Sequence, residues 1–298
     1  MIDQISEYPY IFEDGNDKIL YIDNNLLERY SRNLNFLSNF DKKGNKKYDY
    51  IDKIINSCVL VLGLGGVGSP LIYDLAALGV GKIIAVDFDF VDISNLNRQI
   101  LYKEKHVGKK KVYSAKETIN EFNSNIEFIA IDKKIDSSLD VLDILEQFKP
   151  DCVICVADKP PIKIYKWVNE ACFMKSIPFL YGGNSETTAY YHTVIPNISS
   201  CFLCYEKKLE ENKNKDGYNK YLSILNNSYS TENNCTAASS TLAAFMALDI
   251  VRLITGAEVP LSLNKRILID YKTNIIDEEY VEKQDNCDLC SNNNYDRR

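Results

Sequence analysis

The chain has 298 residues, 45% of them hydrophobic, and a chain of this length can bury one large core or two modest ones. Its 42 acidic residues outnumber its 35 basic residues, so we expect no broad cationic surface for nucleic acid or anionic lipid. The N-terminus has no basic segment followed by an apolar one, and no run of about 18 apolar residues follows. These features indicate a cytoplasmic protein without a membrane span.

Residues 1–55 have a mixed character that differs from the rest of the chain. They start polar, become helix-like over residues 25–35, and end in a loop rich in Lys, Asn and Asp over residues 41–49. We therefore expect residues 1–55 to form an N-terminal arm or helix that contacts a dimer partner. Residues 56–298 are then expected to form the main domain.

From Ser57 onward, short apolar runs alternate with amphipathic segments. This pattern is typical of a parallel sheet that is covered by helices on both faces. It predicts an α/β fold with a Rossmann-like, doubly wound, mostly parallel sheet and an antiparallel C-terminal extension. The expected strands are 58–62, 82–87, 126–131, 152–157 and 178–181, and the expected helices are 67–78, 109–122, 139–148 and 162–175.

The C-terminal third begins with a polar stretch, residues 206–234, which is rich in Asn, Lys and Glu. Such a composition predicts a long mobile crossover segment at the surface. A helix of small residues is expected over 237–254, and it ends before Gly256 as a helix with a C-terminal glycine does. A strand is expected over 266–271.

A glycine-rich turn follows the first strand and precedes the first helix of the main domain. Gly63, Gly65, Gly66 and Gly68 fit G-x-G-x-x-G in the structural context that this motif requires. Such a turn lets backbone amides at the start of a helix face a phosphate, and Asp87, 24 positions after Gly63, suits the ribose hydroxyls. The motif indicates a nucleotide but leaves NAD and ATP both open.

Charged residues after the second strand favour ATP. Asp87, Asp89, Asn95, Arg98 and Lys111 follow one another in the sequence. Carboxylates can hold Mg²⁺, while Arg and Lys neutralise a triphosphate as pyrophosphate leaves. A dehydrogenase has no need of such a set, so an NAD-dependent oxidoreductase remains only as the alternative.

These motifs, together with Arg29-Tyr30-Ser31-Arg32 and two C-x-x-C pairs, resemble the ThiF/MoeB/HesA family of ubiquitin-activating-enzyme-like adenylyltransferases over roughly residues 26–290. The resemblance implies that Gly65 and Gly66 cradle phosphate and that Asp87 holds the ribose. It also implies that Asn95, Arg98 and Lys111 contact the triphosphate, that Asp158 holds Mg²⁺, and that Arg32 enters the partner's ATP site in a homodimer.

The resemblance implies ATP-dependent activation of a C-terminal carboxylate as acyl-AMP. The substrate would be a ribosomally made peptide or a ubiquitin-like sulfur-carrier protein. The sequence Ala157-Asp158-Lys159-Pro160 is closer to the branch that modifies microcin peptides than to the sulfur-carrier branch. We expect no independent peptide-binding domain before Arg29. A catalytically inactive, activating-enzyme-like binding subunit is a further alternative.

Cys201, Cys204, Cys287 and Cys290 form the two C-x-x-C pairs, with 82 residues between the pairs. In a reducing compartment this pattern predicts metal ligation before disulfide formation. Four thiolates form a closed, structural zinc site. Zinc would then attach the C-terminal end of the chain to the sheet.

Two further groups of residues allow two interpretations each. Cys235 resembles the position at which family members carry a cysteine that captures the activated carrier, but it has no basic cluster nearby in sequence, and a plain loop cysteine is slightly favoured. Tyr181, Tyr190 and Tyr191 either line the substrate groove or pack in the core, and packing is favoured.

Overall fold

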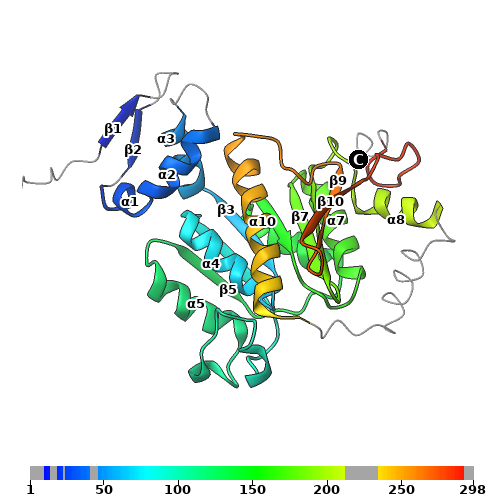
Figure 1. Cartoon of the computed structure of the whole chain (residues 1–298), viewed down its shortest axis with the longest axis horizontal. Coiled ribbons are helices and arrows are strands. Elements are labelled where there is room, and N and C mark those ends of the chain that lie inside the picture. The colour runs from blue at the N-terminus through cyan, green and yellow to red at the C-terminus, as the bar shows by residue number, and fades with distance from the viewer. Residues whose placement is uncertain (1–9, 14–18, 23, 41–45, 212–233, 292–298) are drawn as a thin grey trace, which may run out of the picture.

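The computed structural model describes residues 10–13, 19–22, 24–40, 46–211 and 234–291 (Figure 1). Its main sheet consists of β3 (Cys58–Leu62), β4 (Lys82–Val86), β5 (Glu127–Ile131), β6 (Cys152–Cys155), β7 (Phe179–Asn184), β8 (Thr188–Val194), β9 (Lys265–Asp270) and β10 (Ile275–Tyr280). A separate antiparallel hairpin pairs β1 (Tyr10–Glu13) with β2 (Ile19–Ile22).

The helices are α1 (Asn24–Arg29), α2 (Ser31–Leu37), α3 (Lys47–Ile55), α4 (Gly68–Leu78), α5 (Lys111–Phe122), α6 (Ser138–Phe148), α7 (Lys163–Lys175), α8 (Phe202–Glu211) and α10 (Thr236–Thr255). Three short 3-10 helices are η1 (Ser38–Phe40), η2 (Ile93–Asn95) and η3 (Glu104–His106). The five strands and the helices expected from the alternating pattern are confirmed, with ends that shift by a few residues.

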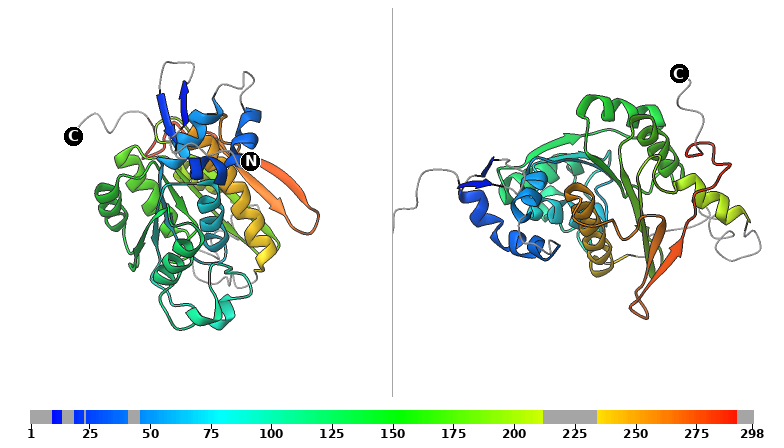
Figure 2. Two further views of the ribbon diagram at one scale, coloured as in Figure 1. Left: turned by 90° about the vertical axis from the view of Figure 1, so that its left-hand side faces the viewer. Right: turned by 90° about the horizontal axis from the view of Figure 1, so that it is seen from above.

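The strand order is β10-β9-β8-β7-β6-β3-β4-β5, and the strands from β5 to β7 are parallel. The remaining neighbours, from β7 to β10, pair antiparallel. The predicted fold class, a doubly wound and mostly parallel sheet with an antiparallel C-terminal extension, is therefore confirmed. The β9-β10 hairpin projects from the body of the molecule (Figure 2).

Helices cover both faces of the sheet (Figure 2). Along β3, Val59 and Val61 belong to the apolar cluster under α3, α4, α5 and α10, whereas Leu60 and Leu62 belong to the cluster under α6, α7 and α8. All four side chains are buried. A strand that is covered on both faces needs apolar side chains at consecutive positions, which explains the continuous apolar run in the sequence.

The N-terminal helices belong to the core on one face of the sheet. Tyr30, Leu34 and Leu37 are buried there, and the Tyr30 hydroxyl accepts a hydrogen bond of 2.8 Å from Asn123 Nδ2. The expected helix over 25–35 is present as α1 and α2, which meet at Tyr30. The loop expected over 41–49 is wrong at its end, because α3 begins at Lys47, and residues 41–45 lie outside the described residues. Contact of this segment with a dimer partner stays a prediction.

The predicted mobile segment over 206–234 is wrong at both ends. Helix α8 extends to Glu211, and its Glu206 is buried and pairs with Lys166 at 2.8 Å. Asn234 is held by the Ser239 hydroxyl at 3.0 Å. Residues 212–233 lie outside the described residues.

Helix α10 is long and largely apolar. The helix has 20 residues, and an 18-residue window of it has a mean hydropathy of 1.6, so by length and composition alone it passes as a membrane span. In the fold it contacts α3, α4, β7 and β8, as the core helix of a globular domain does. It ends before Gly256, whose φ of +66° matches the glycine cap expected there.

A buried carboxylate attaches α10 to the chain that leads into β9. Asp249 is fully buried, and its two oxygens accept hydrogen bonds from Leu261 N (2.8 Å), Ser262 N (2.9 Å), Ser262 Oγ (2.7 Å) and Arg252 Nη1 (2.8 Å). Ser262 Oγ also lies 2.7 Å from the Thr193 hydroxyl of β8. The position of the antiparallel extension therefore depends on one acidic side chain.

We predict that Asp249→Ala lowers the free energy of unfolding by about 3 kcal/mol, because it leaves Arg252 and two backbone N–H groups without their acceptor. Urea unfolding followed by circular dichroism measures this change. Glu146→Ala is the control, since Glu146 pairs with Lys175 at the surface, and its effect should stay within about 0.5 kcal/mol. Equal unfolding midpoints for the two variants would contradict the role of Asp249.

Candidate active site

A cavity of about 600 Å³ opens at the carboxyl ends of β3, β4, β6 and β7. Strand β3 has β4 on one side and β6 on the other, so the chain order reverses there, and ligands of open α/β sheets bind at such a point. Most of the predicted site residues line this cavity: Gly63, Gly65, Gly66, Asp87, Asp89, Asn95, Arg98, Lys111 and Asp158. Gly68, Arg32 and Cys235 do not line it.

The glycine turn after β3 combines a close backbone approach with an open side. Gly63 has a φ of +96°, and a Cβ added there would lie 2.7 Å from Ala157 Cα. A Cβ added at Gly65 would meet nothing within 4 Å. Gly63 is therefore needed for the fold of the turn, whereas Gly65 leaves room beside it for a ligand.

Asp87 holds the glycine turn in place. Its carboxylate accepts hydrogen bonds from Leu64 N at 2.7 Å and from Asp89 N at 2.8 Å. Burial raises the pKa of Asp87, and the nearby charge of Lys111 together with the two N–H bonds opposes this rise. The predicted contact of Asp87 with ribose would add to this structural role, and it stays a prediction.

The basic side chains of Lys111 and Arg98 also line the cavity. Lys111, buried at the start of α5, lies with its Nζ 3.2 Å from Asp89 Oδ2. Arg98 is half-buried, and its Nη1 donates to Ser94 O at 3.0 Å and to Asn97 Oδ1 at 2.9 Å. Both side chains are anchored near the cavity, so charge that develops on a ligand there can be neutralised without a large rearrangement.

Gln99 is a cavity residue to which the sequence analysis assigned no role. Its Oε1 is buried and has no hydrogen-bond partner within the part of the chain that the structure describes. Buried polar atoms nearly always have a hydrogen-bond partner, so this oxygen beside the cavity is available to accept a hydrogen bond from a ligand. The one feature of the sequence that could have indicated a site role for Gln99 is its position directly after Arg98.

The remaining predicted residues lie around or outside the cavity. Asp158 is exposed and follows β6, on the side of the cavity opposite Asp87 and Lys111 in strand order. Arg32 is exposed on α2 and is not brought to the cavity of its own chain. Cys235 is exposed, next to the cavity residue Asn234.

The cavity continues along β7, β8 and β9 beneath α7 and α8. Tyr181 and Tyr190 both line this part. Tyr181 is also fully buried in the apolar cluster on this face, as the favoured packing predicts, and Tyr190 is partly buried against that cluster. Tyr191 points to the opposite face, where its ring centroid lies 6.4 Å from that of Phe245, as packing requires. The cavity lining also includes Tyr205, Arg266 and Glu279, for which no motif in the sequence predicts a site role.

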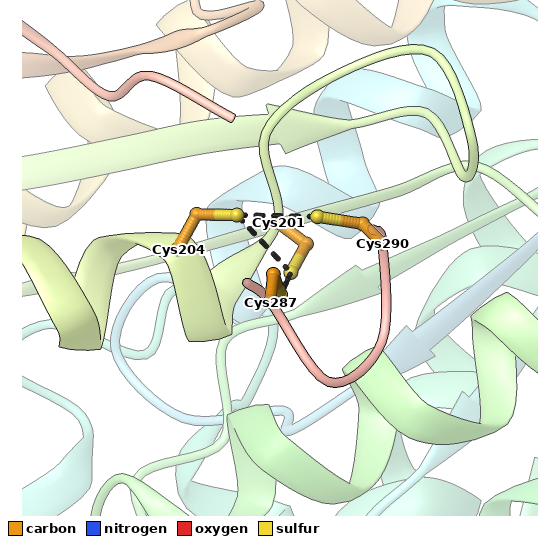
Figure 3. A group of neighbouring side chains, drawn as sticks. All are labelled: Cys201, Cys204, Cys287 and Cys290. Carbon is orange, nitrogen blue, oxygen red and sulfur yellow. Dashed lines mark hydrogen bonds between the residues drawn. The ribbon is translucent and has the colours of Figure 1, made fainter. Parts of the chain in front are cut away.

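The four predicted zinc ligands converge (Figure 3). The sulfurs of Cys201, Cys204, Cys287 and Cys290 are all buried and lie within 4.8 Å of one another. Three of the separations are 3.2, 3.6 and 3.8 Å, close to the value of about 3.8 Å expected for tetrahedral Zn–S bonds of about 2.3 Å. The backbone N–H of Gln284 also donates to Cys204 Sγ at 3.4 Å. The cluster could hold zinc, and it joins α8 to the C-terminal turn.

Comparison with known proteins identifies the family to which this site belongs. Residues 30–291 match the ThiF family. The chain belongs to the ThiF family. Its catalytic class is therefore that of the adenylyltransferases, and the NAD-dependent oxidoreductase alternative is set aside, because the whole domain and not only its glycine turn matches.

The similar proteins include HesA of Trichormus variabilis, which is 30% identical over 267 residues, 89% of each chain. MOCS3-1 of Zea mays, named an adenylyltransferase and sulfurtransferase, is 33% identical over 183 residues. That match covers 60% of this chain and only 36% of the maize protein. The crystal structure of E. coli MccB with ATP superposes with a TM-score of 0.76 at 28% identity, covering 89% of this chain and 75% of MccB.

The two sides of the glycine turn should respond differently to the same added methyl group. We predict that Gly63→Ala lowers the free energy of unfolding by about 2 kcal/mol or more, because the new Cβ meets Ala157 and the backbone is left-handed. Gly65→Ala should change it by no more than about 0.5 kcal/mol. Chemical unfolding of the two variants checks this, and equal losses would refute the assignment of Gly65 as the open position.

Loss of one zinc ligand should remove the metal and destabilise the chain. We predict that Cys290→Ser binds no zinc and has a melting temperature lower by about 10 °C or more. Metal analysis and thermal unfolding measure both effects. Cys235→Ser is the control, since this exposed cysteine lies outside the cluster. Undiminished stability of a zinc-free chain would mean that zinc has no structural role.

Proposed function

We propose that this chain uses ATP to adenylate the C-terminal carboxylate of a peptide or of a ubiquitin-like carrier protein. A carboxylate oxygen forms a bond to the α-phosphorus, the bond from that phosphorus to the oxygen bridging to the β-phosphate breaks, and pyrophosphate leaves with that oxygen. The product is an acyl adenylate. The carbonyl carbon is then open to attack by sulfur, nitrogen or a thiol.

One observation carries this proposal: a single cavity is lined by the glycine turn, two cationic side chains and Asp158. The turn amides suit the phosphates, and Arg98 and Lys111 suit the charge that builds up on departing pyrophosphate. Reaction by positioning and charge neutralisation needs little acid or base chemistry from the protein.

The residues present fit ATP and Mg²⁺. Gly65 leaves space beside the turn, and the unpaired Gln99 oxygen offers an acceptor. Asp158 would hold Mg²⁺ together with the phosphates, since carboxylate and phosphate oxygens are the ligands that Mg²⁺ prefers. The metal, when bound, would withdraw charge from the phosphates, while Lys111 and Arg98 orient them.

The extension of the cavity along β7 to β9 supports a substrate larger than a nucleotide. E. coli MccB, a structural relative, has been solved with MccA, and MOCS3-1 is named a sulfurtransferase as well. A peptide and a sulfur carrier therefore both remain as substrate classes. The sequence around Asp158 favours the peptide.

The proposed active unit is a cytoplasmic homodimer in which residues 1–55 contact the partner. Arg32 is exposed and lies away from the cavity of its own chain, as an arginine that acts on the partner's ATP would. Residues 56–298 then form the adenylation domain. Cys235, exposed beside the cavity residue Asn234, is left as either a nucleophile or a loop cysteine.

Isotope exchange between ATP and pyrophosphate tests adenylation directly. We predict exchange that requires Mg²⁺ and a free C-terminus, supplied as synthetic peptides and as a carrier that ends in Gly-Gly. Asp158→Asn should reduce the exchange rate about 100-fold or more. Asp136→Asn is the control, because Asp136 is exposed and pairs with Lys134 at the surface.

Either of two outcomes would count against the proposal. Unchanged exchange by Asp158→Asn would remove this residue from the magnesium site. If a folded chain binds ATP but catalyses no exchange with any of these substrates, the alternative of an inactive binding subunit would be favoured.

Gly65→Ala separates nucleotide binding from folding. Its stability is expected to match the parent chain, so any loss of ATP-induced thermal stabilisation reports on the site alone. We predict that saturating ATP raises the melting temperature of the parent chain and shifts that of Gly65→Ala by less than half as much. An undiminished shift would mean that phosphate does not approach the turn at Gly65.

A further inference from the structure

A buried arginine lies in the part of the cavity farthest from the glycine turn. Arg266 of β9 is only 7% exposed, yet it lines the cavity. Strand register pairs Cys155 with Tyr181 and Tyr181 with His192. The register between β8 and β9 pairs Tyr191 with Ile267, and its continuation by one residue sets Arg266 opposite His192. Three strand spacings of about 4.8 Å place it about 14 Å from the end of β6.

The surroundings of Arg266 leave one edge of its guanidinium available. The group lies 4.2 Å from the ring centroid of Tyr190 and 4.0 Å from that of Tyr205. Its Nη1 donates to Glu279 Oε2 at 3.0 Å and to the Tyr205 hydroxyl. Its Nε is buried and has no partner among the residues described. The edge formed by Nε and Nη2 therefore makes no hydrogen bond within that part of the chain.

The neighbouring groups do not satisfy this edge. The Glu279 carboxylate pairs with two cations: its Oε2 pairs with Arg266, and its Oε1 lies 3.1 Å from Lys208 Nζ. His192 adds no charge, because burial, and then the charge of Arg266, lower its pKa to about 3. A buried, charged donor without an acceptor is costly, and an arginine edge with two parallel N–H groups matches a carboxylate.

We propose that Arg266 binds an acidic side chain of the substrate, several residues before the carboxylate that is activated. This inference rests on the proposed function and adds a substrate class to it. An extended peptide needs about four residues to cover about 14 Å. Fewer residues suffice if the acidic side chain itself covers part of this distance. The acidic residue is therefore expected roughly at the third to fifth place from the C-terminus.

The zinc cluster supports this compartment from the opposite side. Phe202, Tyr205 and Leu209 of α8 line the cavity, and Cys201 and Cys204 lie at the start of the same helix. A metal on these sulfurs would hold α8 over Arg266. The cluster thus contributes to substrate binding as well as to stability.

Peptide binding tests the inference separately from catalysis. The probes are fluorescein-labelled heptapeptides of Ala and Gly with a free C-terminus. Each peptide carries a single glutamate, at one of the second to sixth places from the C-terminus. A matched peptide has glutamine at the same place. Fluorescence anisotropy at millimolar ATP without added Mg²⁺ gives the affinities. We expect about tenfold tighter binding of glutamate than of glutamine at one or two adjacent places. Equal binding at every place, or no binding at millimolar protein, would overturn the proposal.

Variants of the ion pair sharpen the test because they act in opposite directions. Glu279→Gln frees Arg266 from its partner and should raise the preference for glutamate. The double variant R266Q/E279Q removes both charges of the Arg266–Glu279 pair, and it should bring the ratio of glutamate to glutamine affinity close to one. Lys265→Gln with Glu278→Gln is the matched control, since this pair joins the same two strands at 2.6 Å outside the cavity.

Two further outcomes keep the test decisive. If the double variant fails to fold, Arg266→Lys keeps the charge and loses the fork, and the glutamate preference should fall about threefold or more. A preference that survives in both variants would overturn the proposal. Glutamate preference without pyrophosphate exchange would refute adenylation alone, whereas exchange without preference would refute the role of Arg266 alone.

Discussion

The close approach between the turn after β3 and the chain after β6 is the constraint on which the site depends. A Cβ at Gly63 would lie 2.7 Å from Ala157, so only glycine allows the two segments to meet there. Asp87 then fixes the turn from the next strand, through the N–H of Leu64. The carboxyl ends of three neighbouring strands are thereby held together, with Asp158 and Lys111 on opposite walls of one cavity.

From this point the sheet itself orders the rest of the cavity. The row from Cys155 through Tyr181 and His192 to Arg266 runs across four strands on a single face. Parallel strands supply the nucleotide end, and the antiparallel extension supplies the aromatic and charged end. The four-cysteine cluster and Asp249 both attach this extension to helices, because the cluster joins α8 to the C-terminal turn and Asp249 joins α10 to the chain before β9.

Two carboxylates in this protein, those of Asp87 and Asp249, accept hydrogen bonds from its own backbone. Asp87 accepts two backbone N–H groups and Asp249 accepts two as well, so each orders a segment that carries other side chains into position. Asp249 carried no signal in the sequence, since an acidic residue in an apolar helix resembles a surface position. Asp158 differs from both because it stays exposed at the rim, where a ligand can reach it.

The sequence by itself determined the fold class, the glycine turn and the cysteine pairs, because apolar periodicity and short motifs depend on neighbouring residues. Most of the site residues that it predicted do line the cavity, since the carboxyl ends of parallel strands meet at one edge of a sheet. Only the tertiary structure decided that Arg266 and Tyr190 join the cavity and that α8 replaces part of the expected mobile segment. The place of Arg266 depends on pairing between β8 and β9, which are far apart in the chain, and no local pattern records that pairing.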